Sequence, residues 1–206
     1  MKNLQCPTKI KDEDTSRFLM KSVFGSEENR DYMRICIDRA YRDFNRTLHG
    51  FSKISGADSL REDGKELVGK CFDKLKSLEI HSQEQFDTWN ETSCNSLCSL
   101  YHKKGFGEFY IGQAQKWLNM TLKYIYVMGE KRVSGYERFS KFGHIPIDNV
   151  IIGKFRKEGA PSLGKSWSKL KDYKKYISYQ RWLREKFKGR DPLVVEFYEY
   201  LGNDYK

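Results

Sequence analysis

Apolar residues recur every three or four positions along most of the chain, with charged residues between them. This period is typical of amphipathic helices and differs from the strict alternation of a half-buried strand. It predicts one helix from about residue 31 to 49 and another from about 67 to 78. Ser82, with Gln85 three positions later, has the sequence of a capping box and predicts a third helix that continues to His102.

Glycine and proline positions predict where the remaining helices begin and end. Gly129 follows one helical segment in the position that a C-cap prefers, and the segment 50–64 lacks the helical period and is predicted to be a loop. The remaining helices are predicted over residues 111–128, 146–155, 168–187 and 192–201. The pattern therefore predicts an all-α fold, a compact bundle of about seven helices without strands, in a single domain over residues 1–206.

The chain carries a large positive charge, with 38 Lys and Arg against 28 Asp and Glu, a net charge of +10. Such an excess favours association with a polyanion through release of counterions, so nucleic acid, DNA above all, is the expected partner. Basic proteins without such a partner are also common, and this alternative stays open. The chain has neither an apolar run long enough to cross a membrane nor a signal-peptide pattern, and its five cysteines fit reduced thiols, so we expect a cytoplasmic protein with no membrane contact.

The helix predicted over 111–128 carries Lys116, Asn119 and Lys123 along one stripe of an otherwise apolar sequence. A solvated face is one explanation of this stripe. However, apolar residues flank the lysines, which indicates that this side of the helix is partly enclosed. Enclosing a lysine removes hydration and favours a neutral amine, which is a nucleophile toward carbonyl-like carbons.

The sequence HIPIDNVI, residues 144–151, places Pro146 and Asp148 at the start of the short helix. Proline disfavours helix at the residue before it, and an aspartate caps the free backbone amides that follow. A structural cap is one interpretation of Asp148. The other is that a carboxylate held rigidly at a helix N-terminus stabilises a positive charge that develops during a reaction.

Together these two segments resemble the helix-hairpin-helix DNA glycosylase superfamily. Its signature is a glycine-containing hairpin, a helix with the nucleophilic lysine of the lyase-competent members, and a Pro-Val/Ile-Asp turn with the catalytic aspartate. The matching residues are Gly112, Lys116 and the PID sequence at 146–148. The separation of Lys116 from Asp148 (148 − 116 = 32) and the sequence QKWLNMTLKY are similar to the archaeal 8-oxoguanine DNA glycosylase branch. The resemblance covers residues 111–152, and the usual Leu-Pro-Gly-Val-Gly hairpin is absent.

The resemblance implies a DNA glycosylase and abasic-site lyase that acts on a flipped-out nucleotide, with an oxidised purine as the base that this branch removes. Lys116 would attack the anomeric carbon of the sugar. Asp148 would stabilise the positive charge on the sugar and help to move protons. No cofactor is implied.

Two segments are candidates for contact with DNA. The sequence KKGFGEFYIGQ, residues 103–113, combines lysines with glycines, which let backbone amides approach a phosphate. The helix over 168–187 interleaves basic and aromatic residues, which suits phosphate contacts with stacking, although an aromatic core face opposite a solvated basic face explains it as well. The candidate DNA-binding residues are Lys103, Lys104, Gly105, Gly107, Gly112, Gln113, Lys174, Lys175 and Arg181.

Base recognition requires an aromatic face and an amide or a carboxylate. The candidates are Trp89, Gln115, Trp117, Asn119 and Trp182, with core packing as the alternative for the aromatic residues. Cys94, Cys98 and His102 repeat every four positions, but the first and third would lie about 12 Å apart on a straight helix, too far to share one metal ion. We therefore expect no metal site.

Two other classes of function stay open on the sequence alone. The first is a non-catalytic nucleic-acid-binding protein that has the same helical scaffold without the reaction. The second is a helical interaction module that binds a protein or nucleotide partner. The observation that separates these classes from the enzyme is whether Lys116 and Asp148 converge on one cleft.

Overall fold

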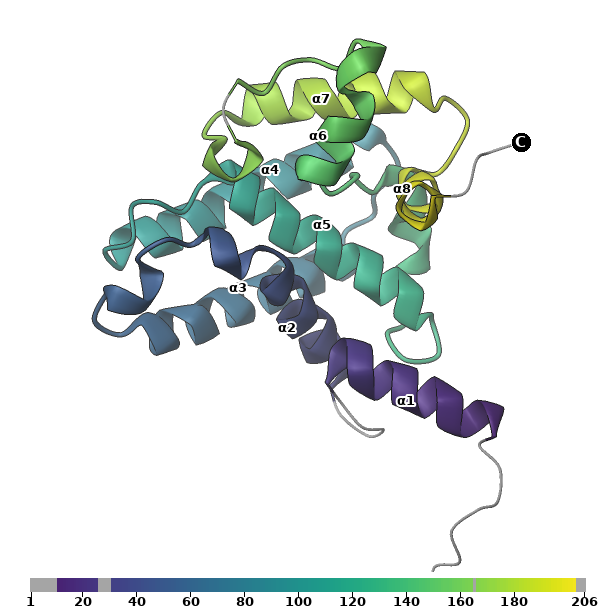
Figure 1. Ribbon diagram of the computed structural model, residues 1–206, viewed down its shortest axis with the longest axis horizontal. Helices are drawn as coiled ribbons and strands as arrows, with labels where there is room; N and C mark the ends of the chain where they lie inside the picture. The colour runs from purple at the N-terminus through teal and green to yellow at the C-terminus, as the bar shows by residue number, and fades with distance from the viewer. Residues whose placement is uncertain (1–10, 26–30, 165, 203–206) are drawn as a thin grey trace, which may run out of the picture.

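A computed structural model describes residues 11–25, 31–164 and 166–202 (Figure 1). In this part of the chain the structure consists of α-helices, short 3-10 helices and loops, with no β-strand. The α-helices are α1 (Asp12–Phe24), α2 (Tyr32–Phe44), α3 (Ala57–Ser77), α4 (Gln83–Lys103), α5 (Ile111–Met128), α6 (Asn149–Phe155), α7 (Tyr173–Lys186) and α8 (Pro192–Leu201). The prediction of an all-α bundle is confirmed.

Helix α5 lies at the centre of the bundle, with α2 and α3 below it and α6, α7 and α8 above it in the view of Figure 1. It packs mainly against α2, α4 and the 3-10 helix η5 (Trp167–Lys169). Fifteen of its 18 residues are buried. A helix that is enclosed on all sides leaves its polar side chains without water, so each of them must find a partner within the protein.

Local sequence signals position most of the helix ends. Ser82 and Gln85 form the expected capping box at the start of α4. Gly129 ends α5 with a φ of 77°, and Gly202 ends α8 with a φ of 71°, a backbone conformation that glycine adopts without a steric penalty. These boundaries were predicted correctly because they depend on neighbours in the sequence.

Several boundaries were predicted wrongly, and α1 was not predicted. Helix α2 ends at Phe44 instead of residue 49, and α6 begins at Asn149 instead of residue 146. Helix α3 begins at Ala57, inside the segment 50–64 that was predicted to be a loop. Gly64 lies within this helix, and a Cβ atom at this position would be 2.8 Å from Tyr101 Oη, so glycine lets α3 approach Tyr101 closely. Helix α7 begins at Tyr173 instead of residue 168, because Asp172 caps it by accepting a hydrogen bond from the backbone N–H of Lys174 at 2.8 Å.

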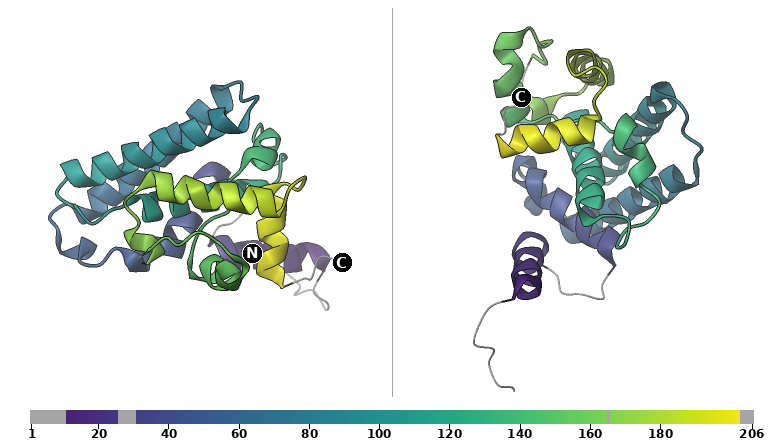
Figure 2. Two further views of the ribbon diagram at one scale, coloured as in Figure 1. Left: turned by 90° about the horizontal axis from the view of Figure 1, so that it is seen from above. Right: turned by 90° about the vertical axis from the view of Figure 1, so that its right-hand side faces the viewer.

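The buried apolar residues form one continuous cluster that extends from Phe24 to Val195. Aromatic rings fill much of it, for example Tyr101 and Phe109, which stack with ring centroids 4.1 Å apart. Helix α1 lies at the edge of the bundle and projects from it in Figure 1 and in the right-hand view of Figure 2. Among the described residues, none of the helices is both long and apolar enough to cross a membrane.

Candidate active site

The structure brings the two predicted catalytic residues into direct contact. Lys116 lies on the central helix α5 and is only 5% exposed. Asp148 is the N-cap of α6. The Lys116 Nζ and Asp148 Oδ2 atoms are 2.6 Å apart, well inside the limit of about 8 Å expected for a catalytic pair.

The two carboxylate oxygens of Asp148 have different partners. Oδ1 accepts hydrogen bonds from the backbone N–H groups of Val150 at 2.9 Å and Ile151 at 3.1 Å, which caps α6. Oδ2 faces Lys116. The interpretation of Asp148 as a structural cap is therefore confirmed, and its second oxygen pairs with Lys116, while a role in a reaction stays a prediction. The Asp148 side chain is 26% exposed, so the pair reaches the surface on the aspartate side.

The rest of the polar stripe on α5 is also buried. Lys123 is 7% exposed and pairs with Glu196 of α8 at 2.5 Å. Asn119 is 2% exposed and donates hydrogen bonds to Gln115 Oε1 at 3.0 Å and Tyr176 Oη at 2.7 Å. The stripe is therefore not a solvated face, and the prediction that this side of the helix is enclosed is confirmed.

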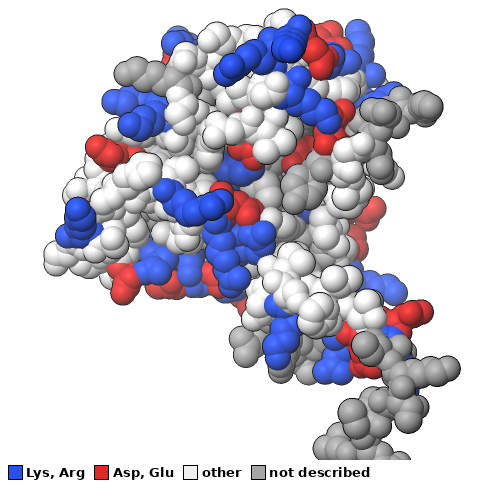
Figure 3. Space-filling view, in the orientation of Figure 1, with Lys and Arg blue, Asp and Glu red and all other residues white. Residues whose placement is uncertain are grey.

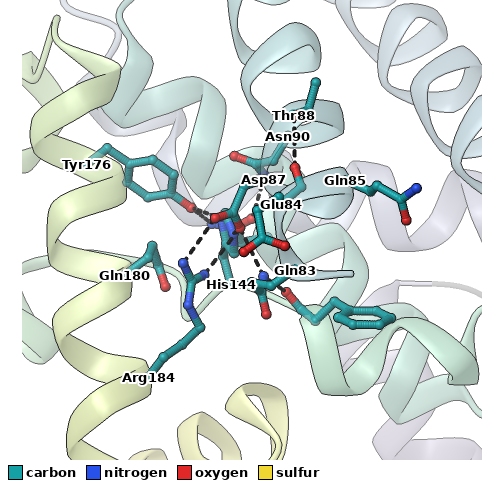
Figure 4. Close-up of polar contacts among 12 residues, drawn as sticks. Gln83, Glu84, Gln85, Asp87, Thr88, Asn90, His144, Tyr176, Gln180 and Arg184 are labelled. Carbon is teal, nitrogen blue, oxygen red and sulfur yellow. Dashed lines mark hydrogen bonds and ion pairs between the residues drawn. The ribbon is translucent and has the colours of Figure 1, made fainter. Parts of the chain in front are cut away.

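A buried hydrogen-bond network joins His144, in the segment before α6, to residues of α4 and α7 (Figure 4). His144 is completely buried, with Nδ1 2.8 Å from Tyr176 Oη and Nε2 2.7 Å from Asp87 Oδ1. Arg184 reaches both oxygens of Asp87, at 3.2 Å and 3.0 Å. Nothing in the sequence pattern indicated this network, because its members come from α4, α7 and the loop before α6.

The environment of the network fixes its protonation. Burial lowers the pKa of His144, and the nearby Asp87 opposes this shift only in part. Burial acts to raise the pKa of Asp87, but the hydrogen bonds from His144 and Gln83 and the charge of Arg184 outweigh it and lower the pKa to about 2. A neutral His144 donates from Nε2 to Asp87 and accepts at Nδ1 from the Tyr176 hydroxyl. Because His144 and Tyr176 are both fully buried, we assign the network to anchoring the chain and not to chemistry.

Most of the predicted DNA-binding residues are exposed. Lys103 and Lys104 end α4 and begin the loop that contains Gly105 and Gly107, while Lys174, Lys175 and Arg181 lie on the outer face of α7. The loop lies beside the segment before α7, because Lys171 Nζ is 4.8 Å from the centre of the Tyr110 ring. The two candidate segments thus meet in space, and their contact with DNA stays a prediction. Figure 3 shows that basic side chains lie in several groups over one face, with acidic side chains among them.

The prediction that Gly112 and Gln113 contact DNA requires a correction. The Gly112 N–H donates to Leu170 O at 3.0 Å, and a Cβ atom there would lie 1.8 Å from Trp167 O. Gln113 is 2% exposed, and its side chain bonds to Tyr110 and Thr47. These groups have partners inside the protein, so both residues serve packing and neither presents a group to a phosphate.

The predicted base pocket also requires a correction. Trp117 is fully buried and its Nε1 donates to Ile37 O at 3.2 Å, while Trp89 is 5% exposed and its Nε1 donates to Cys71 O at 3.0 Å. Gln115 and Asn119 are buried and hydrogen-bonded as well. These four residues are buried in the core, and Trp89 and Trp117 have the packing that was the alternative for the aromatic residues. Trp182 is partly exposed and packs on Phe155, and its role stays a prediction.

Neither the three cavities described next nor the series Cys94, Cys98 and His102 includes Lys116 or Asp148. The cavities of about 510, 480 and 290 Å³ are lined by other residues than Lys116 and Asp148. The largest of the three lies between α3 and α4, with Leu67 and Trp89 in its lining. His102 Nε2 lies 2.8 Å from Phe109 O, and within the described ranges no group of three His, Cys, Asp or Glu side chains is placed to hold a metal ion.

Comparisons with models of known protein families, with curated proteins and with solved structures gave no match to this chain.

Proposed function

We propose that the chain is a DNA base-excision glycosylase and abasic-site lyase of the helix-hairpin-helix type. The observation that supports this most is the direct contact of Lys116 with Asp148. A lysine nucleophile needs a fixed anion nearby that accepts its proton and stabilises positive charge on the sugar. Asp148 meets this need, because its cap bonds hold the carboxylate while its second oxygen faces the amine.

The residues suggest the following reaction. The Asp148 carboxylate takes a proton from the Lys116 ammonium, and the neutral amine attacks C1′ of a flipped-out nucleotide. The bond from C1′ to the base breaks, and the base leaves with the electron pair and takes up a proton. Opening of the sugar ring then gives a Schiff base between Lys116 and C1′. Loss of a C2′ proton from this intermediate expels the 3′ phosphate and cleaves the strand.

The exposed basic residues support DNA as the substrate. Lys103, Lys104, Lys174, Lys175 and Arg181 are all exposed, and the segments that carry them lie next to each other. Lysines and arginines in such positions bind phosphates of any sequence, which brings DNA to the site but does not select a base.

A second candidate function is a nucleic-acid-binding protein without catalysis. The specific observation in its favour is the burial of Trp89, Gln115, Trp117 and Asn119, which removes four of the five residues proposed for a base pocket. A protein that holds DNA without removing a base would not need that pocket.

Strand cleavage and base release separate the two functions. Duplexes that contain one uracil, one 8-oxoguanine or one abasic site are incubated with the protein, and the products are analysed by gel electrophoresis and by detection of free base. The enzyme is expected to cleave at least one of these duplexes, whereas Lys116→Gln cleaves none. Binding of all three duplexes without cleavage by the wild-type protein would favour the second function.

A further inference from the structure

Two buried glutamines hold the backbone of the segment before Asp148. Gln180 of α7 accepts a hydrogen bond from Ile145 N at 3.1 Å and donates one to Ile145 O at 2.7 Å. Gln115 of α5 accepts one from Ile147 N at 3.2 Å and donates one to Ile147 O at 2.8 Å. Each amide therefore makes the same pair of bonds that a neighbouring strand would make with this residue.

The orientation of the Gln115 amide is fixed by its other partners. Its Nε2 also donates to Gly112 O at 3.0 Å, and its Oε1 also accepts from Asn119 Nδ2 at 3.0 Å. Asn119 Nδ2 donates in addition to Tyr176 Oη, and Asn119 Oδ1 accepts from Asn90 Nδ2 at 3.1 Å. Because the Asn119 amino group must face two oxygens, the oxygen of Gln115 is the atom that meets Ile147 N.

The hydrogen bonds between Gln115 and Ile147 and the ion pair between Lys116 and Asp148 are in the same register. Gln115 directly precedes Lys116, Ile147 directly precedes Asp148, and both contacts join residues that are 32 positions apart. A slip of one residue between α5 and this segment would turn the Asp148 side chain away from the lysine. The two bonds from Gln115 to Ile147 oppose such a slip at the position next to the pair.

We propose that Gln115 is a positioning residue for the Lys116–Asp148 pair, which it keeps in contact by fixing Ile147. The effect on the reaction rests on the proposed function, whereas the effect on the contact itself does not. Gln180 provides a matched control, because it makes the same two bonds with Ile145, which lies three positions before Asp148.

The first test measures how accessible the Lys116 amine is, without any DNA. Wild-type protein, Gln115→Met and Gln180→Met are treated with formaldehyde and cyanoborohydride, and methylation of each lysine is followed by peptide mass spectrometry. Lys123 is the internal reference, because it lies on the same helix and pairs with Glu196. Gln115→Met is expected to raise the ratio of Lys116 methylation to Lys123 methylation about tenfold. Gln180→Met is expected to raise this ratio less than about twofold, although both variants should lose a similar amount of stability. Equal ratios in all three proteins would overturn the proposal.

A second variant covers the case in which Gln115→Met does not fold. Gln115→Glu keeps the volume and the acceptor, but as a carboxylate it cannot donate to Ile147 O. The Lys116 to Lys123 ratio is expected to be high at pH 8 and to return toward the wild-type value as acid protonates the carboxyl group, whose O–H then donates to Ile147 O. A ratio in this variant that equals the wild-type ratio at every pH would also overturn the proposal.

A third measurement tests whether the hydrogen bonds between Gln115 and Ile147 affect the reaction. On a duplex with an abasic site, Gln115→Met is expected to lower the cleavage rate at saturating protein about tenfold or more and to leave the Kd for DNA within about twofold. Wild-type protein that cleaves no duplex would contradict the proposed function, and the methylation ratios would still decide the role of Gln115. Cleavage by Gln115→Met at the wild-type rate would contradict the positioning role alone.

Discussion

The Lys116 Nζ and Asp148 Oδ2 atoms lie 2.6 Å apart, although 32 positions separate the two residues in the chain. The lysine is on α5, where 15 of 18 residues are buried, and the aspartate begins a helix of seven residues at the surface. A buried charge is stable only when it is paired, so the contact explains how the central helix tolerates this lysine. Under the proposed function, the same contact gives the lysine a proton acceptor.

The two roles of Asp148 are separable by substitution. Asp148→Asn retains an oxygen that caps α6 but loses the charge beside Lys116, whereas Asp148→Ala loses both. We expect Asp148→Ala to be less stable than Asp148→Asn by about 1 kcal/mol, the usual value of an N-cap. Urea unfolding of both variants measures this difference, and equal midpoints would show that the cap does not stabilise the protein.

Gly112 is required for the close approach of α5 to η5. A Cβ atom at this position would lie 1.8 Å from the backbone oxygen of Trp167, and backbone cannot rotate away as a side chain can. We expect Gly112→Ala to lower the free energy of unfolding by about 3 kcal/mol or more. Gly107→Ala is the control, since no atom lies within 4 Å of its Cβ position, and it should change stability by less than about 0.5 kcal/mol. A Gly112→Ala protein as stable as the control would contradict the packing described.

The buried His144 predicts a loss of stability in mild acid. Its pKa in the folded protein is lowered from 6.5, so the unfolded chain takes up a proton first as the pH falls. The stabilisation that the buried neutral His144 contributes is complete above about pH 6.5. It decreases as the pH falls below that value toward the lowered pKa of His144 in the folded protein. Asp87, with a pKa of about 2, adds a second loss as the pH falls from 3.8 toward 2.

Urea midpoints measured from pH 8 to pH 4 test this prediction. We expect them to change little above pH 7 and to fall below pH 6.5 in the wild-type protein and in the control His81→Gln, where an exposed histidine is replaced. His144→Gln should be less stable at pH 7 and should show a shallower decrease between pH 6.5 and 5. The same slope in His144→Gln and the wild type would assign the decrease to other groups.

The exposed basic residues of α7 predict binding of DNA that depends strongly on salt. Replacement of Lys174, Lys175 and Arg181 together by alanine removes three positive charges from one exposed helix face. The affinity for a duplex at about 50 mM salt should fall, and the slope of log K against log salt should decrease by about 3 if each residue neutralises one phosphate. Equal slopes for the variant and the wild type in a titration from about 50 to 200 mM would exclude this face from the interface.

The parts of the fold that could be predicted are those that depend on neighbouring residues. Caps such as Ser82 with Gln85 and Asp148, and end signals such as Gly129, act within a few positions and are visible in the sequence. The start of α3 was missed, because residues 57–64 lack a clear apolar period, and the glycine at position 64 is explained only by its close contact with Tyr101.

The candidate site divides in the same way. Lys116 and Asp148 were found from their residue types and their local sequence. The network of Asp87, His144 and Tyr176 was not found, because a histidine becomes an anchor only through partners that the fold brings from distant segments. The burial of Trp89, Gln115, Trp117 and Asn119 was missed for a related reason, since the sequence of a helix does not show which neighbour covers each residue.

Covalent trapping tests the central claim most directly, because borohydride reduces a Schiff base between a lysine and an abasic sugar to a stable bond. We predict that the wild-type protein forms an adduct with a duplex that carries an abasic site, and that peptide mapping places the DNA on Lys116. Lys116→Gln should form no adduct while its Kd for the same duplex stays within about threefold, and Lys53→Gln, the control at an exposed lysine outside the proposed DNA-binding set, should retain most of the trapping. An adduct mapped to another lysine, full trapping by Lys116→Gln, or no adduct in the wild type with uracil, 8-oxoguanine or abasic duplexes would contradict the account.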